Sequence, residues 1–170
     1  MKVPLSEIIT GISVVSANDG CIALSEHLYG TEEAFVQQMN KRAKELGLIQ
    51  TLFKNSSGLP AEGHYMSARD IATLARELII SHPKILEIES ITEFTFNEIK
   101  QLNRNPLLGI YPGADGLKTG WTEEAGYCLF GTAKQNGMRL ISVVLKTNDE
   151  DERLAASREL LDYGYQNFEL

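Results

Sequence analysis

The sequence is short of cysteine, histidine and proline, and these shortages exclude several kinds of site. Its 170 residues include two cysteines, three histidines and five prolines. Cys21 and Cys128 lie far apart and form no CxxC pair, so we expect two buried small side chains rather than a disulfide, a redox pair or a zinc site. His27, His64 and His82 lack metal-ligand spacing. The sequence therefore predicts no metal site.

Basic charge and long apolar runs are scarce as well. Lysine and arginine total 16 against 23 acidic residues, giving a net charge of −7. Because there is no basic run, the pattern excludes an unspecific nucleic-acid-binding protein. The longest apolar runs, such as residues 140–145, are too short to span a bilayer. Pro4, Ser6 and Glu7 stand where a secretory signal would have its apolar core, so we expect no signal peptide or membrane anchor in this sequence.

What the sequence does contain is typical of one globular domain. Apolar residues make up 43% of it and charged residues 23%, which are ordinary values. In residues 1–90 the apolar side chains recur at helical spacing, first over 5–15, with a break at 16–18. Further helices are expected after a cap at Asp19, Thr31 or Ser67, the last with Asp70 in a capping box, with ends at Gly30, Gly47 and Pro83.

The pattern changes in residues 91–170, which predict strands. A weak edge strand is expected at 92–96 and a loop at 103–113. Three stronger strands are expected at 114–119, 127–133 and 139–146, the last two joined by Asn136-Gly137 as a hairpin. A closing helix over 152–168 carries one apolar stripe that covers the sheet: Leu154, Leu161, Tyr165 and Phe168. Helices, an antiparallel meander and a final helix predict the α+β class.

Two short motifs could carry chemistry. Lys118-Thr119-Gly120 ends a predicted strand, where a cation beside a hydroxyl suits a carboxylate and a glycine lets a ligand backbone approach. Ser16-Ala17-Asn18 occupies the junction of two predicted helices. Each motif alone is weak, since the first also fits a strand end with a solvated lysine and the second a helix stop followed by a cap.

Taken together, order, separation and flanking residues resemble one family over nearly the whole chain. That family is the serine-type D-alanyl-D-alanine carboxypeptidases, the low-molecular-mass penicillin-binding proteins, whose Ser-x-Asn and Lys-Thr-Gly motifs match residues 16–18 and 118–120. The flanks that also match are Phe35 to Asn40, Leu46-Gly47-Leu48, Gly58-Leu59, Asp70, Asn103-Arg104-Asn105, Leu107-Leu108, Ala125-Gly126-Tyr127 and Tyr163-Gly164. The resemblance implies a β-lactamase/transpeptidase-like fold, with residues 1–170 a partial catalytic domain: 1–90 mainly helical, 91–170 sheet plus C-terminal helix.

The resemblance implies roles for three catalytic residues. The family's reaction removes the terminal D-alanine of a peptidoglycan stem peptide through a serine acyl-enzyme. Ser16 would relay a proton to the leaving D-alanine. Asn18 would orient the substrate amide and the family's activating lysine, and Lys118 would add positive potential.

It also implies substrate-binding residues on the strand that holds Lys118. Thr119 would bind the terminal carboxylate, with Arg104 near it, and Gly120 would let the substrate lie along this strand as an added strand. The Trp121 backbone N–H would be one oxyanion donor. Two departures stand out: Ala17 replaces the commoner glycine, and Trp121 is bulky.

The family's third motif, Ser-x-x-Lys, supplies the nucleophile and belongs upstream of the other two. The single match here, Ser81-His82-Pro83-Lys84, comes after Ser-x-Asn, and Pro83 disrupts the helical turn that should align serine and lysine. We therefore expect a fragment that lacks its nucleophile and is inactive alone. Such a fragment would expose apolar surface and self-associate.

The resemblance implies no metal and no organic cofactor. The expected partners are a stem peptide ending in D-Ala-D-Ala and, for the intact enzyme, β-lactam antibiotics, which mimic that dipeptide. By family resemblance the location is extracytoplasmic, in the cell envelope. One alternative is a non-catalytic module of the same fold that binds peptidoglycan peptides. A β-lactamase is disfavoured because no loop with a deacylating glutamate is evident.

Overall fold

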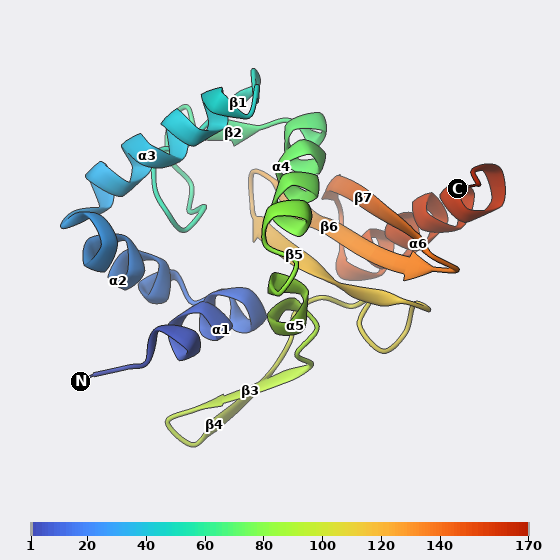
Figure 1. The fold of residues 1–170 in the computed structure, drawn as a ribbon, viewed down its shortest axis with the longest axis horizontal. Helices are drawn as coiled ribbons and strands as arrows, with labels where there is room; N and C mark the ends of the chain where they lie inside the picture. The colour runs from blue at the N-terminus through green and yellow to red at the C-terminus, as the bar shows by residue number, and fades with distance from the viewer. Residues whose placement is uncertain (1, 170) are drawn as a thin grey trace.

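The computed structural model describes residues 2–169, and five helices occupy its first half (Figure 1). The apolar spacing predicts the first four, and α5 is a short addition after Pro83. Figure 1 shows the first four in an open arc that runs from beside the sheet to α4 in front of it. A short two-stranded ladder lies between α3 and α4. The bounds of these elements are α1 Leu5–Val15, α2 Asn18–Tyr29, α3 Glu32–Glu45, β1 Thr51–Leu52, β2 Tyr65–Met66, α4 Ala68–Ser81 and α5 Ile85–Glu89.

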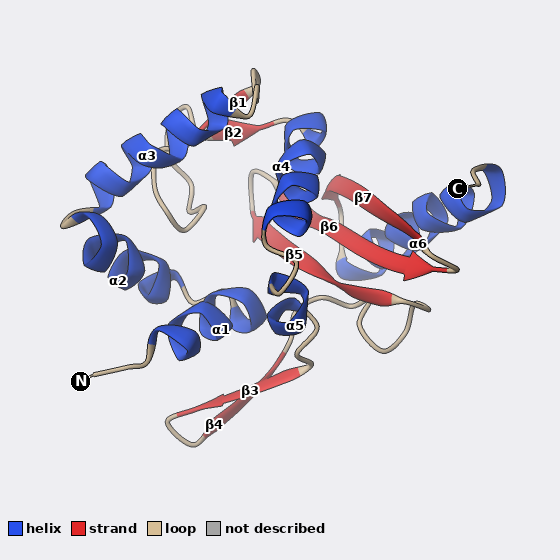
Figure 2. Ribbon diagram, in the orientation of Figure 1, coloured by secondary structure: helices blue, strands red, loops and turns tan. Residues whose placement is uncertain are grey.

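The second half is an antiparallel sheet followed by one helix, which confirms the expected α+β fold (Figure 2). The main sheet has the order β5-β6-β7, so β5 and β7 are its edges. A separate hairpin of β3 and β4 projects away from it. The bounds are β3 Glu93–Phe96, β4 Ile99–Leu102, β5 Ala114–Thr122, β6 Gly126–Gln135, β7 Met138–Thr147 and α6 Glu150–Asn167.

Side-chain caps fix the starts of α3 and α4, with two differences from the sequence expectation. Thr31 caps α3 as predicted, and Ser67 caps α4 by accepting a hydrogen bond from the Asp70 N–H. Asp70 does not complete a capping box, because its buried carboxylate instead accepts the Gln50 N–H and the Thr51 hydroxyl and so ties β1 to α4. Asp19 is not a cap, since α2 already begins at Asn18.

The β6–β7 hairpin has the geometry that its sequence predicts. Asn136 and Gly137 have φ angles of 50° and 89°, as a two-residue turn between twisted strands requires. The sequence pattern does not predict strand β4, since all four of its side chains are exposed and show no apolar alternation. The tight turn at Asn97 and Glu98, both with positive φ, directs it back along β3.

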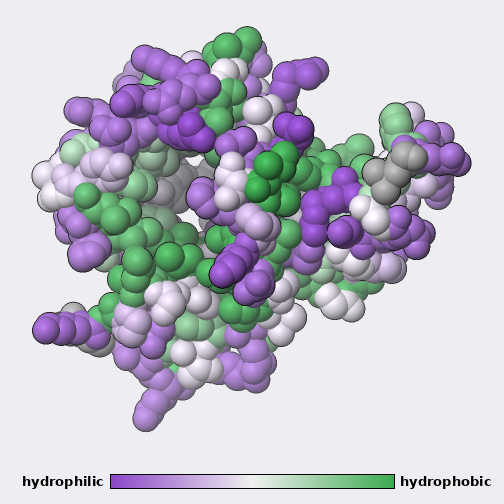
Figure 3. All heavy atoms as spheres, viewed as in Figure 1, coloured by the Kyte–Doolittle hydropathy of each residue, from purple (hydrophilic) through white to green (hydrophobic). Residues whose placement is uncertain are grey.

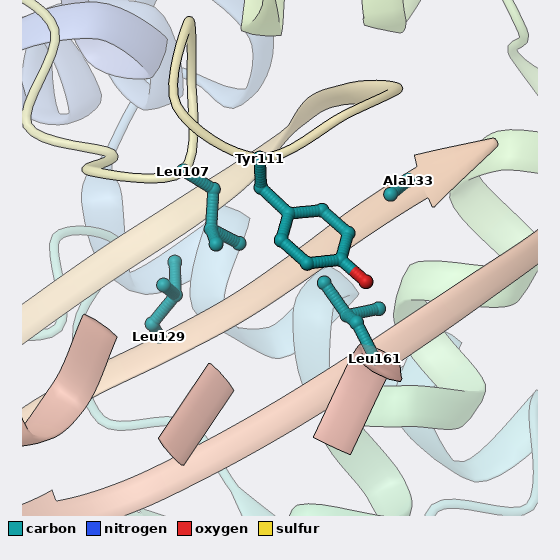
Figure 4. Close-up of a cluster of buried hydrophobic side chains, with 5 residues drawn as sticks. All are labelled: Leu107, Tyr111, Leu129, Ala133 and Leu161. Atoms are coloured by element: carbon teal, nitrogen blue, oxygen red, sulfur yellow. The ribbon is translucent and has the colours of Figure 1, made fainter. Parts of the chain in front are cut away.

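The core lies between the loop of residues 103–113, strand β6 and helix α6 (Figure 4). Five buried side chains form it: Leu107, Tyr111, Leu129, Ala133 and Leu161. Leu154 and Tyr165 pack against this cluster as the stripe predicts, but Phe168 is 58% exposed and lies on Tyr163 instead, because α6 ends at Asn167. Figure 1 shows α4 in front of the sheet and α6 behind it, and both contact β7.

Candidate active site

Ser16 lies at a sharp corner between two helices. It follows the last residue of α1 in the left-handed conformation, with φ 59° and ψ 47°, and its backbone N–H donates to the Gly11 carbonyl. This conformation reverses the chain, so that α2 starts only two residues later with Asn18, which is exposed. Gly20 permits the tight packing of the two helices, because a Cβ there would lie 3.2 Å from Ile12. The Ser-x-Asn motif is therefore a rigid corner.

Lys118 comes from the middle of β5 and reaches that corner. Its ammonium donates a short hydrogen bond to the Ser16 hydroxyl, 102 residues away in sequence, and a second to the Thr119 carbonyl at 3.0 Å. The structure thus brings the Ser-x-Asn and Lys-Thr-Gly motifs into direct contact. The same contact joins the helical half of the chain to the sheet.

Two asparagines place Arg104 beside the same corner. The Asn103 side chain donates to the Ile91 carbonyl at 2.7 Å, and the buried Asn105 side chain donates to the Leu117 carbonyl of β5 at 3.4 Å. Between them, the Arg104 backbone N–H donates to the Val14 carbonyl of α1 at 3.3 Å. The Arg104 side chain itself is exposed.

The remaining candidates follow Lys118 along an open strand edge. Strand β5 pairs with β6 alone among residues 2–169, so its outer edge is free of other strands. An added Cβ on the exposed Gly120 would meet only the Cys128 Cβ, at 4.0 Å. Trp121 is 58% exposed and lies against Tyr127, with 5.9 Å between ring centroids. This edge can accept an extended peptide.

Opposing influences act on the pKa of Lys118. Burial lowers its pKa to about 8, and the positive charges of Arg104 and Arg153 act in the same direction. Glu89 and Cys21 act in the opposite direction. A substantial share of this ammonium can therefore lose its proton near neutral to mildly basic pH.

The sequence pattern does not single out two buried charged residues near this lysine. Glu89 ends α5 and is 6% exposed. Arg153, on the first turns of α6, is 3% exposed, and its contacts are a 3.4 Å interaction with Glu150 and the Tyr127 ring at 5.7 Å. Apolar periodicity carries no signal for a charged side chain that tertiary packing buries.

The only Ser-x-x-Lys match of the sequence does not join this site. Ser81 is the exposed last residue of α4, and its hydroxyl donates to Glu77 at 2.7 Å. His82 breaks the helix, with φ −136° and ψ 60°, and the exposed Lys84 precedes α5. Within residues 2–169, no hydrogen bond links Ser81 or Lys84 to either motif.

The two cysteines are only partly shielded from solvent. Both cysteines are free but half-buried, contrary to the expected full burial. Cys21 is near Lys118, and burial raises the pKa of its thiol.

A groove of about 550 Å³ opens between the end of α2, α3, β1 and α4, and no candidate site residue lines it.

Comparison with known proteins identifies the family. The family model for D-alanyl-D-alanine carboxypeptidase matches residues 1–149. The chain belongs to the D-alanyl-D-alanine carboxypeptidase family. The carboxypeptidase DacF of Bacillus subtilis is 44% identical over 99% of the chain, and DacA of Escherichia coli is also 44% identical over 99%. The chain spans 44% and 42% of the length of these two carboxypeptidases.

Solved structures of carboxypeptidases and penicillin-binding proteins share the fold. Penicillin binding protein 5 of Haemophilus influenzae superposes with a TM-score of 0.96 at 42% identity, over 99% of this chain and 50% of that one. A Listeria monocytogenes penicillin-binding protein in its cefotaxime-bound form gives a TM-score of 0.88 at 36% identity, over 96% and 67%. None of the helices in residues 2–169 combines the length and hydropathy needed to cross a membrane.

The partly buried position of Lys118 predicts a specific dependence of stability on pH. Its folded-state pKa of about 8 lies below the ordinary value of 10.5, so between these pH values the unfolded chain binds more protons and stability rises with pH. Relative to Lys118→Met, the wild type should gain on the order of 2 kcal/mol in unfolding free energy between pH 7.5 and 10. Urea unfolding at several pH values measures this, with Lys134→Met as the exposed-lysine control. A wild-type-to-variant difference that stays constant with pH would contradict the burial of Lys118.

Proposed function

We propose that this chain carries the substrate-recognition region of a carboxypeptidase site that removes the terminal D-alanine from peptidoglycan stem peptides. The observation that carries the proposal is the hydrogen bond from Lys118 to the Ser16 hydroxyl, which unites the family's two motifs in one place. Family membership supports the substrate class. The chain is then a partial catalytic domain, in which the helical residues 1–90 and the sheet residues 91–170 meet at this bond.

The terminal carboxylate of the peptide binds beside Lys118, at the middle of β5, in this proposal. Lys118 and the exposed Arg104 supply positive charge, and the half-buried Thr119 supplies a hydroxyl donor. A carboxylate is the ligand that such a group of donors favours, because charge-assisted hydrogen bonds are the strong ones. The dipeptide lies along the free edge of β5 at Gly120, and the Trp121 N–H stabilises the developing oxyanion.

The reaction needs a serine nucleophile in addition to these groups. Its oxygen attacks the carbonyl carbon of the penultimate D-alanine and loses its proton, the peptide C–N bond breaks, and Ser16 relays that proton to the departing amine of D-alanine. Water then hydrolyses the ester. Asn18, at the start of α2, orients the substrate amide. Ser81 is held by Glu77 away from the motifs, so we propose that these 170 residues do not supply the nucleophile and are inactive by themselves.

The intact enzyme is proposed to react with β-lactam antibiotics and to act outside the cytoplasmic membrane. A Listeria monocytogenes relative of this fold was solved in its cefotaxime-bound and ampicillin-bound forms. A β-lactam mimics the terminal dipeptide, so its carboxylate would bind beside Lys118 as well. The location follows from the substrate, since stem peptides belong to the cell wall.

A second candidate is a non-catalytic module of the same fold that binds peptidoglycan peptides. The exposed position of Ser81 and Lys84, apart from the Lys118–Ser16 contact, favours it. The two candidates share the peptide-binding edge and differ in chemistry alone. Addition of a segment with the Ser-x-x-Lys motif separates the two candidates. Restored acylation supports the carboxypeptidase, and its absence supports the binding module.

Binding of the dipeptide tests the recognition site directly. Acetyl-D-Ala-D-Ala should shift the backbone amide signals of Thr119, Gly120 and Trp121 in NMR spectra of the labelled chain, and the L,L-dipeptide should not. Lys118→Met should weaken binding about tenfold or more, because a hydrogen bond between charged groups is worth about 1.5–3 kcal/mol. Lys134→Met, an exposed lysine on β6, is the matched control. Equal binding by both dipeptides would contradict the proposal.

We also propose that the chain self-associates through its apolar helical face. Ile22, Leu28 and Tyr29 of α2 are 37%, 53% and 49% exposed, and Tyr29 lines the apolar groove described above. Figure 3 shows hydrophobic residues gathered over the α1–α2 region, next to a hollow in this face. Exposed apolar patches of this kind favour association.

Light scattering tests this association. The chain should have a mass above that of the monomer, and Leu28→Glu should lower the mass towards it. Ile110→Glu, a comparably exposed position in the loop before β5, should have no effect. A monomer at every concentration would rule out self-association.

A further inference from the structure

Glu89 is a buried acid for which the proposed reaction has no use. It is the last residue of α5 and is 6% exposed. Its Oε2 atom is buried and has no hydrogen-bond partner within residues 2–169. A buried carboxylate without compensation is costly, so its surroundings should contain a positive charge.

The backbone places Glu89 directly against the strand of Lys118. The Glu89 Cβ lies 3.2 Å from the position that a Cβ on Gly116 would occupy, so a side chain at 116 would collide with it. Gly116, Leu117 and Lys118 pair in regular register with Thr132, Gly131 and Phe130. Lys118 lies two residues beyond Gly116 on this strand, and the charge of Glu89 acts on its ammonium.

Helix α1 closes the other side of the same space. Ser13, buried on α1, lies close enough to Glu89 for its hydroxyl to lower the pKa of that carboxyl. Ser16, which accepts the Lys118 hydrogen bond, follows Ser13 by three residues, one helical turn. Ser13 and Glu89 on the interior side and Lys118 and Ser16 at the candidate active site thus belong to one polar region.

Every other charged group that influences Lys118 can be named. Arg104 from the loop before β5 and Arg153 from α6 disfavour its protonated form, and Cys21 from α2 and Glu89 from α5 favour it. Glu89 is the larger of these two stabilising influences, and Cys21 adds little at neutral pH because burial raises the pKa of its thiol. The effect is mutual, since Lys118 lowers the pKa of Glu89 while burial raises it.

We propose, on the basis of the proposed function, that Glu89 is a positioning residue whose carboxylate holds the Lys118 ammonium charged and directed at Ser16. Glu89 does not touch the substrate. A charged Lys118 donates to the Ser16 hydroxyl and attracts the substrate carboxylate, and a neutral amine loses that attraction. Glu89 therefore sets the pH range in which the Lys118 ammonium can attract the substrate carboxylate.

Titration of Lys118 tests this without any substrate. The chain is labelled with ¹³C at the lysine Cε, Lys118→Gln identifies the Lys118 signal, and the signal is followed from pH 6 to 11. In Glu89→Gln the pKa of Lys118 should fall below its wild-type value of about 8. Glu87→Gln, which removes an exposed acid from the same helix, should leave it unchanged. Glu89→Asp should recover part of the shift. An unchanged Lys118 titration in folded Glu89→Gln would overturn the proposal.

A reciprocal measurement covers the case in which Glu89→Gln does not fold. The Glu89 carboxyl carbon is titrated in the wild type and in Lys118→Gln, where its pKa should rise because the neighbouring ammonium is gone. An identical Glu89 titration in both proteins would overturn the proposal. Neither experiment involves dipeptide binding or acylation, so its failure is distinguishable from a failure of the proposed function.

Discussion

The hydrogen bond between the Lys118 ammonium and the Ser16 hydroxyl is the interaction on which the arrangement of the candidate site depends. It joins the helical half of the chain to the sheet. Its two partners are placed by independent devices, the left-handed corner after α1 and the edge strand β5. The buried amide of Asn105 and the backbone of Arg104 then tie the intervening loop to both. An acid, Glu89, compensates the lysine from the interior side.

Local signals in the sequence predict most of the fold. Thr31 and Ser67 cap their helices, and Asn136-Gly137 forms the hairpin, because each acts within a few residues. Local signals do not predict the role of Asp70 or the presence of strand β4. Asp70 caps nothing because β1 captures its carboxylate, and β4 has no buried face to produce an alternating pattern. A contact 20 residues away in sequence decides the first outcome, and pairing with β3 across the turn at Asn97 and Glu98, without a buried face, decides the second.

The residues of the candidate site also fall into two groups, those that the sequence identifies and those that it does not. The motif residues Ser16, Asn18 and Lys118 are identified from the sequence through resemblance, and the structure brings Ser16 and Lys118 together. Glu89 and Arg153 cannot be found that way, because nothing in their local sequence shows that packing buries them. The chain spans 44% and 42% of the length of two carboxypeptidases that it matches. What we propose for it is a recognition surface, with the nucleophile supplied from outside these residues.

The central claim is that these 170 residues recognise the substrate but contain no activated serine. Intact mass spectrometry after incubation with benzylpenicillin tests it most directly. We expect no covalent adduct on this chain, and acylation only when a segment with the Ser-x-x-Lys motif is supplied. A stoichiometric penicilloyl adduct on the chain alone would contradict the claim and would show that a serine within it is activated. Ser81→Ala and Ser16→Ala would then identify which one.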